Sequence, residues 1–187
     1  FILYEVNEKR GLHMKKALIV IDMQNDFING SLRTREAQAI VPNVAKLIQS
    51  SDYAAIFFTR DTHSKDYLDT QEGKNLPIEH CIRDTNGWKI HDDIAVASIE
   101  SDMAGVIIDK PTFGTFDIAD ELAEDNYDEV DLVGLCTDIC VITNALILKT
   151  QFPEMKINII ENATAGTTPE AKQAALTVAK SCQINII

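Results

Sequence analysis

The fold is decided by the stretch EVDLVGLCTDICVITNALILKT, residues 129–150. Its first part, residues 129–135, predicts a buried strand followed by a turn. An apolar helix is then expected over residues 138–150. Cys140 lies where the strand gives way to the helix, so the chain places a thiol at the edge of its predicted sheet.

Short apolar runs recur along the chain and alternate with helical patterns. Strands are predicted over five further ranges: 17–22, 54–60, 104–110, 156–160 and 184–187. Helices are predicted over three further ranges: 39–50, 116–126 and 168–180. Strands that alternate with helices favour an α/β fold with helices on both faces of a sheet. We therefore expect a three-layer α/β/α architecture around a six-stranded, mostly parallel central sheet.

The length and the start of the chain bear on its domain organisation. The sequence has 187 residues, which is enough for one domain with a sizeable core. Phe1 is not a start methionine, whereas Met14 followed by two lysines is typical of a native start. We therefore predict a non-native extension over residues 1–13 and a single domain over residues 14–187.

Charge and composition argue against several classes of partner. The net charge is −12, so the protein repels nucleic acids and anionic membranes. No apolar run is long enough to span a bilayer. The four cysteines, at positions 81, 136, 140 and 182, lack the pattern of a small disulfide scaffold. Reduced thiols in the cytoplasm and a small-molecule partner are expected.

Several chemically active side chains follow predicted strands, and the carboxyl ends of parallel strands meet at one edge of a sheet. They are Asp22, Asp61, Lys110 and Cys140. Taken singly, Asp22 is an ordinary cap carboxylate, Lys110 a surface lysine and Cys140 a small core residue. Together they offer a nucleophile, a proton acceptor and a charge partner, and the start of a helix favours a thiolate.

Three motifs in this order resemble the isochorismatase-like cysteine hydrolases, a family that includes nicotinamidases. They are ALIVIDMQNDF at residues 17–27, KPTFGTF at residues 110–116 and VGLCTDICV at residues 133–141. The resemblance extends over residues 16–187. It implies that the whole of this region is one cysteine hydrolase domain.

The resemblance also implies the catalytic residues. Asp22, Lys110 and Cys140 match the family's Asp-Lys-Cys triad. The backbone N–H groups of Cys136 and Cys140 match its oxyanion hole, and the peptide bond between Leu135 and Cys136 matches its cis peptide. In this scheme Asp22 takes the thiol proton, the thiolate attacks an amide carbonyl, and water later hydrolyses the thioester.

The irregular stretch after the second predicted strand holds candidate metal ligands. They are Asp61, His63, Glu72 and His80. By spacing alone such loop residues are more often solvated than metal-binding. The resemblance maps the family's Asp-x-His pair onto Asp61 and His63, its later histidine onto His80, and a glutamate used by some members onto Glu72. Imidazoles with carboxylates favour zinc, and iron or manganese also fit.

The resemblance further implies hydrolysis of nicotinamide to nicotinate and ammonia in NAD salvage, with the metal holding the pyridine nitrogen. Phe27, Leu76 and Phe113 are the expected substrate contacts. Many nicotinamidases have an aromatic residue at the position of Leu76, so one stacking contact with the pyridine ring is expected to be missing here. Asp26 is interpreted as a hydrogen-bond acceptor for its own turn.

Other functions stay open at this point. They are hydrolysis of another small amide or ureido compound, vinyl-ether hydrolysis of isochorismate, and a non-enzymatic binding role. The metal pattern and the cysteine favour an amidase over an isochorismate hydrolase, and the intact triad argues against a binding module. A homo-oligomer, either a dimer or a tetramer, is expected.

Overall fold

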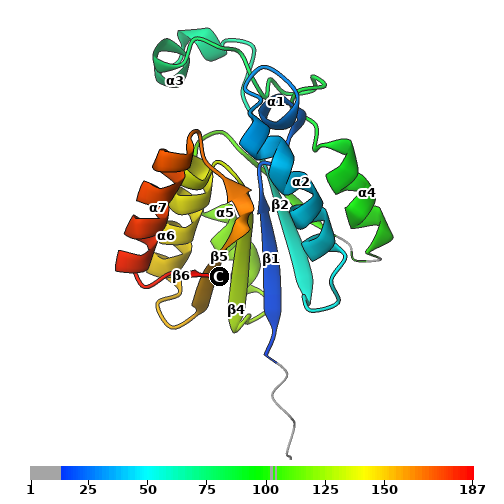
Figure 1. Ribbon diagram of the computed structural model, residues 1–187, viewed down its shortest axis with the longest axis vertical. Coiled ribbons are helices and arrows are strands. Elements are labelled where there is room, and N and C mark those ends of the chain that lie inside the picture. The colour runs from blue at the N-terminus through cyan, green and yellow to red at the C-terminus, as the bar shows by residue number, and fades with distance from the viewer. Residues whose placement is uncertain (1–13, 102, 104) are drawn as a thin grey trace, which may run out of the picture.

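The computed structural model describes residues 14–101, 103 and 105–187, and it contains one six-stranded sheet in the order β3-β2-β1-β4-β5-β6 (Figure 1). The strands are β1 (Lys16–Ile21), β2 (Ala55–Asp61), β3 (Val106–Lys110), β4 (Glu129–Leu135), β5 (Lys156–Ala165) and β6 (Asn185–Ile186). Every pairing is parallel. The expected extension over 1–13 and position 104 of the third predicted strand lie outside the described residues.

Helices cover both faces of the sheet, as the alternation of elements predicts. One face carries α5 (Asp117–Ala123), α6 (Ile142–Gln151) and α7 (Pro169–Ser181), and the other carries α1 (Asn25–Ile28), α2 (Arg35–Ile48) and α4 (Asp92–Glu100). Two shorter helical segments, η1 (Tyr67–Asp69) and α3 (Gln71–Asn75), follow β2. The expected three-layer α/β/α architecture is confirmed, with a sheet that is parallel throughout.

Residues 17–21 of β1 are all apolar because both faces of this strand are buried. Ala17, Ile19 and Ile21 are buried in the core under α5, α6 and α7. Leu18 and Val20 are buried in the core under α2 and α4. Successive side chains of a strand point to opposite faces, so a strand covered by helices on both sides needs apolar residues at every position.

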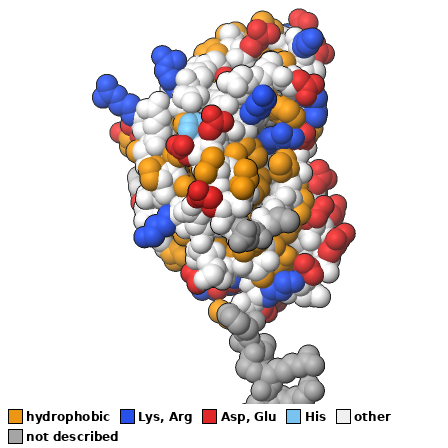
Figure 2. Space-filling view, turned by 90° about the vertical axis from the view of Figure 1, so that its right-hand side faces the viewer, with side chains coloured by type: hydrophobic (Ala, Val, Ile, Leu, Met, Phe, Trp, Pro, Cys, Tyr) orange, Lys and Arg blue, Asp and Glu red, His pale blue; other side chains and the backbone are white. Residues whose placement is uncertain are grey.

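The helix α4 is not predicted by the sequence, and its surface explains the omission. Val96 is 50% exposed and Ile99 is 78% exposed, so two of its large apolar residues face solvent and obscure the helical period. They lie with Val106 and Ile107 of the edge strand β3 among the exposed hydrophobic side chains. Figure 2 shows hydrophobic side chains gathered over the middle of the face on this side of the molecule.

The turn after β4 also differs from its prediction. The expected helix over 138–150 begins instead with a π-helical turn, η2 (Thr137–Val141), and α6 follows it. Cys140 therefore lies inside a widened turn. Gly134 has a φ of 108°, and a Cβ there would lie 2.0 Å from the carbonyl oxygen of Ile21. Glycine thus lets the end of β4 approach the end of β1, next to Asp22.

The carboxyl ends of the strands share one edge, and the segment from η1 through α3 lies beyond this edge (Figure 1). The loop from Thr62 to His91 returns to β2, where Ile82 forms a parallel bridge with His63. In the described part of the chain, no helix is long and apolar enough to cross a membrane. The fold thus places a long loop over the edge that carries the candidate site.

Candidate active site and metal centre

The three candidate catalytic side chains come together at the edge of the sheet. Asp22 follows β1, Lys110 is the last residue of β3, and Cys140 lies in the turn after β4. The Nζ atom of Lys110 lies 2.6 Å from Asp22 Oδ2 and 3.4 Å from Cys140 Sγ. Lys110 and Asp22 are 0% exposed and Cys140 is 6% exposed. The ordinary interpretation of Lys110 as a surface lysine is therefore wrong.

The two oxygen atoms of the Asp22 carboxylate have different surroundings. Oδ1 accepts a hydrogen bond from Thr59 Oγ1 at 2.6 Å, and the Asp22 N–H donates back to the same hydroxyl at 3.1 Å. Oδ2 forms the ion pair with Lys110, yet it accepts no hydrogen bond of good geometry from the described residues. Oδ2 is therefore the oxygen of Asp22 that is left to take a proton.

Burial and the neighbouring charges together set the protonation of this cluster. Burial raises the pKa of the Cys140 thiol well above its usual value, and the negative charge of Asp22 raises it further. Burial also raises the pKa of Asp22, although the Lys110 ammonium opposes this shift. Burial lowers the pKa of Lys110, but Asp22 and Cys140 outweigh it, so the net shift is upward. The cluster is thus a charged lysine beside a protonated thiol and a basic carboxylate.

The main chain around Cys140 is held by a residue that the sequence did not single out. Asn144 is 1% exposed, and its Nδ2 donates to the carbonyl oxygen of Cys140 at 2.8 Å. Its Oδ1 accepts from the N–H of Thr115 at 3.0 Å, and its Nδ2 also donates to the carbonyl of Phe113 at 3.2 Å. Asn144 therefore ties the turn after Lys110 to the turn that carries Cys140.

The peptide bond between Leu135 and Cys136 is cis. The carbonyl oxygen of Cys136 accepts hydrogen bonds from the N–H groups of Ile139 at 3.1 Å and Val141 at 3.0 Å. The side chain of Cys136 is half-buried and lines the same pocket as Cys140. The two residues expected to form an oxyanion hole thus border one space.

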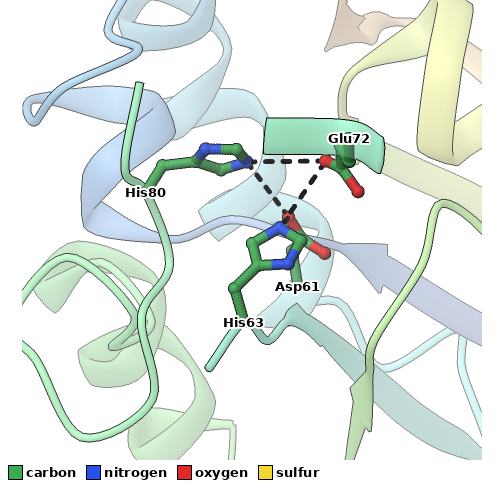
Figure 3. Close-up of side chains that lie close together, drawn as sticks. All are labelled: Asp61, His63, Glu72 and His80. Atoms are coloured by element: carbon green, nitrogen blue, oxygen red, sulfur yellow. Dashed lines mark hydrogen bonds and ion pairs between the residues drawn. The ribbon is translucent and has the colours of Figure 1, made fainter. Parts of the chain in front are cut away.

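The four candidate metal ligands also come together (Figure 3), and one donor atom from each of Asp61, His63, Glu72 and His80 lies within 4.8 Å of the others. His63 Nε2 is 3.0 Å and His80 Nε2 is 3.5 Å from Asp61 Oδ2. Glu72 Oε1 is farther away, at 3.6 Å from His63 Nε2 and 3.9 Å from His80 Nε2. The Glu72 side chain is also the most exposed of the four, at 23%.

The chemistry of these donors fits a divalent cation. His80 Nδ1 lies 2.8 Å from the carbonyl oxygen of Ile78, which can only accept, so the ring proton belongs on Nδ1 and Nε2 keeps its lone pair. Burial raises the pKa of Asp61, but hydrogen bonds with the His63 and His80 rings outweigh it and lower the pKa, so the carboxylate is ionised; an imidazole that donates to Asp61 from Nε2 gives up this proton when the nitrogen binds an ion. Two imidazole nitrogens with two carboxylate oxygens suit zinc and similar ions.

One pocket joins the two clusters. It has a volume of about 260 Å³, and both Cys140 and the ligands Asp61, Glu72 and His80 line it. The expected substrate contacts line it as well: Phe27, Leu76 and Phe113. Asp61 connects the clusters directly, because its Oδ2 faces the histidines while its Oδ1 lies 3.6 Å from Lys110 Nζ.

Asp26 accepts one hydrogen bond within its own turn, as expected, and a second one from the long loop. Its Oδ1 accepts from the N–H of Ser31 at 3.3 Å, within that turn. Its Oδ2 accepts from the N–H of Cys81 at 2.8 Å, and Cys81 belongs to the long loop next to His80. Trp88, from the same loop, donates from Nε1 to Thr62 Oγ1 at 2.8 Å. The bond from Cys81 thus ties the loop to α1, and the bond from Trp88 joins the end of the loop to its first residue.

Comparison with known proteins places the chain in a family. The family model described as the isochorismatase domain matches residues 16–187. A nicotinamidase/pyrazinamidase of Mycobacterium tuberculosis is 26% identical over 186 residues, covering 92% of this chain and 98% of that protein. A yeast nicotinamidase, from Saccharomyces cerevisiae, is 28% identical over 173 residues, covering 70% of this chain and 80% of its own.

Solved structures agree with this placement. The crystal structure of the nicotinamidase/pyrazinamidase PncA from Bacillus subtilis is 30% identical with a TM-score of 0.82, covering 92% of this chain and 99% of that one. A pyrazinamidase of Pyrococcus horikoshii in complex with zinc is 28% identical with a TM-score of 0.76, covering 92% of this chain and 98% of that one. The chain described here belongs to the isochorismatase family, and nicotinamidases are among its relatives.

Proposed function

We propose that this protein hydrolyses nicotinamide to nicotinate and ammonia, in the salvage of NAD in the cytoplasm. Family membership and the named relatives make it a hydrolase that acts on amide C–N bonds. The observation that carries the finer proposal is the shared pocket, in which Cys140 and the ligand group border a space of about 260 Å³. A small planar amide can reach both clusters at once.

Acylation begins with the proton of Cys140. Asp22 Oδ2 takes this proton as the sulfur attacks the carbonyl carbon of the amide, and the carbonyl electron pair moves to the oxygen. Backbone N–H groups of Cys136 and Cys140 stabilise the resulting oxyanion. Asp22 then gives the proton to the amide nitrogen, the C–N bond breaks, and ammonia leaves a thioester on Cys140.

Deacylation uses the same groups in the opposite direction. Asp22 takes a proton from a water molecule as that water attacks the thioester carbonyl. The C–S bond then breaks, the carboxylic acid is released, and the proton returns to the Cys140 sulfur. Lys110 remains charged between the carboxylate and the sulfur, 2.6 Å from Asp22 Oδ2 and 3.4 Å from Sγ, where it stabilises the thiolate whenever it forms.

The ligand group orients the substrate. Asp61, His63 and His80 would hold a divalent ion, with zinc favoured, and Glu72 would complete the set. Such an ion supplies a Lewis-acid position for the pyridine nitrogen of nicotinamide. The residues of this chain then set how far that position lies from Cys140, because Asp61 and His80 line the pocket together with the thiol.

Apolar side chains hold the ring between these two points. Phe27 lies with its ring centroid 5.7 Å from that of His80, and Phe113, in the turn after Lys110, also lines the pocket. Leu76 is 37% exposed and provides an aliphatic wall where many nicotinamidases have an aromatic one. This wall favours a second candidate, hydrolysis of another small amide or ureido compound, because a stacking partner for the ring is missing at that position.

The test is ammonia release from a panel of purified compounds: nicotinamide, pyrazinamide, N-carbamoyl amino acids and ureidoacrylate. Isochorismate is followed in parallel by its own assay. We expect the highest kcat/KM for nicotinamide, with pyrazinamide as a second substrate. A preference for a ureido compound would support the second candidate, and turnover of isochorismate alone would contradict the amidase mechanism.

A further inference from the structure

The side chain of Gln24 is fully buried and is bonded to the main chain of two other segments. Its Nε2 donates to the carbonyl oxygen of Asp61 at 2.9 Å and to that of Trp88 at 2.8 Å. Its Oε1 accepts from the N–H of Asp61 at 2.7 Å. The amide thus binds both main-chain groups of a candidate metal ligand, much as a neighbouring strand would.

Helix capping does not explain a glutamine at this position. Gln24 is the N-cap residue of α1, a position where Ser, Thr, Asp and Asn are preferred. Its side chain makes no capping hydrogen bond within the described residues. The amide is directed instead to Asp61 and to Trp88, which lie at the start and near the end of the long loop.

Asp26, in the first turn of α1, holds the other side of the ligand group. Its Oδ2 accepts from the N–H of Cys81 at 2.8 Å, and the carbonyl oxygen of Cys81 accepts from the N–H of His63 at 3.0 Å. Cys81 has a φ of 47°, which is uncommon for a residue other than glycine. His80 directly precedes Cys81, so the hydrogen bond to Asp26 holds the main chain next to this candidate ligand.

Main-chain bonds join the same short segment to the loop. The N–H of Asn25 donates to the carbonyl of Lys89 at 2.9 Å, and the N–H of Asp26 donates to that of Gly87 at 3.0 Å. A Cβ at Gly87 would lie 2.0 Å from Asp26 Oδ2, so the two segments are in close contact. In Figure 3 Asp61 and His80 approach the ligand group from different segments.

We propose that Gln24 and Asp26 are positioning residues for the metal centre: Gln24 fixes the main chain of Asp61, Asp26 fixes that of Cys81 beside His80, and together they set the separation of these two ligands. The inference rests on the metal centre of the proposed function and goes beyond it. Neither side chain would touch the ion. Their removal would weaken metal binding because the free protein would no longer hold the ligands at a fixed distance.

Variants at Asp26 separate positioning from simple attraction between its negative charge and the cation. Asp26→Asn removes the charge and keeps a carbonyl oxygen for the Cys81 N–H, while it loses the longer bond from the Ser31 N–H. Asp26→Glu keeps the charge but moves the carboxylate by one methylene group. Positioning predicts that Asp26→Asn binds zinc like the wild type while Asp26→Glu binds it more weakly. Attraction of charge predicts the reverse order.

The experiment is calorimetric titration of zinc into the metal-free full chain. Gln24→Met, which is similar in size but has no amide, and Asp26→Ala should each raise the zinc Kd by about 10–100-fold, a typical effect of outer partners of metal ligands. Gln49→Met is the matched control, since the Gln49 Nε2 donates to the exposed Glu100 carboxylate at 2.7 Å at the C-terminal end of α2, and neither residue lines the pocket. It should leave the Kd unchanged.

The outcomes separate the positioning role of Gln24 and Asp26 from the existence of the metal centre. The melting temperature of each metal-free variant shows whether it is folded, and the two milder Asp26 variants carry the test if Gln24→Met or Asp26→Ala does not fold. Equal zinc Kd values for the wild type and the folded Gln24 and Asp26 variants would overturn the positioning role and leave the metal centre intact. Absence of zinc binding by the wild type would overturn both. A weakened Asp26→Asn beside an unchanged Asp26→Glu would also overturn positioning at that residue.

Discussion

Two clusters share one pocket, but the chain builds them in different ways. Asp22, Lys110 and Cys140 lie at or just after the ends of three strands and are almost completely buried. Of the candidate metal ligands, Asp61 is the last residue of β2 and His63 lies two residues beyond it. Glu72 and His80 come from a long loop, and Glu72 is partly exposed.

The difference shows which parts of the site depend on the sheet and which depend on polar contacts of the loop. Parallel strands in fixed register bring the ends of β3, β2, β1 and β4 to one edge of the sheet without help from the loop. His80 reaches the site only because the loop returns, and its neighbour Cys81 is bonded to Asp26 and His63. Changes in the first cluster should therefore affect chemistry or folding, and changes in the second should affect metal binding.

The largest effect is expected for the nucleophile. Cys140→Ser should lower kcat by more than about 10³-fold, because a hydroxyl is a far weaker nucleophile than a thiolate beside the same lysine. The zinc Kd should not change, since Cys140 is not one of the candidate ligands. Turnover and zinc titration of the same preparation measure both quantities. A variant that keeps its activity would break the assignment of Cys140.

The next effect concerns the buried ion pair. Lys110→Met leaves the Asp22 carboxylate buried without its partner at 2.6 Å, which should cost about 3–5 kcal/mol of unfolding free energy. Asp22→Asn should lower turnover by at least about 10²-fold, since it removes the proton acceptor.

The double variant Asp22→Asn/Lys110→Met is the control for this pair. It should be more stable than Lys110→Met alone, because no unpaired charge remains. Urea unfolding of the three variants measures the free energies. Additive losses in the double variant would show that the two charges are not coupled.

The sequence could predict the first cluster because its chemistry is tied to strand ends, which apolar runs reveal. It could not show that Lys110 is buried, since a single lysine after a strand is usually solvated. The full length of β5 also exceeded the prediction over 156–160, because residues 161–165 are less apolar and follow an irregular register between β4 and β5. The residue types and the succession of strands along the chain were visible in the sequence, but the burial of Lys110 was not.

The second cluster was less accessible to sequence reasoning. Spacing alone did not distinguish Glu72 and His80 from solvated loop residues, and the resemblance to a family supplied the assignment. Gln24 and Asn144 were missed because a side chain that binds distant main-chain groups leaves no periodic signal. Such contacts depend on which segments the fold brings together, and only the structure shows them.

Within the metal cluster, we expect the two loop ligands to differ. His80→Ala should weaken zinc binding more than Glu72→Ala does, because His80 is almost fully buried and lies closer to Asp61 Oδ2, at 3.5 Å. Glu72 is 3.6 Å or more from both histidines and partly solvated. Zinc titration of both variants measures the order. An equal or larger loss for Glu72→Ala would show that the loop places the carboxylate as firmly as the imidazole.

The smallest effect is expected for the second thiol of the pocket. Cys136→Ala should leave turnover almost unchanged, because the mechanism uses only the backbone N–H of this residue. Burial raises the pKa of the Cys136 thiol to about 12, so this thiol stays protonated at neutral pH. If Cys136→Ala is folded but inactive, the Cys136 side chain takes part in catalysis, and Cys140 is not the only thiol that the reaction needs.

The same thiol makes a prediction about stability at high pH. In the unfolded chain a cysteine loses its proton near pH 8.5, whereas the folded Cys136 keeps it, so its contribution is fully present below that pH and is lost as the pH rises toward about 12. Over this window the wild type should lose up to about 1.4 kcal/mol per pH unit more than Cys136→Ala. Urea unfolding at several pH values measures the two slopes. Parallel slopes would mean that the folded Cys136 thiol ionises as easily as the unfolded one.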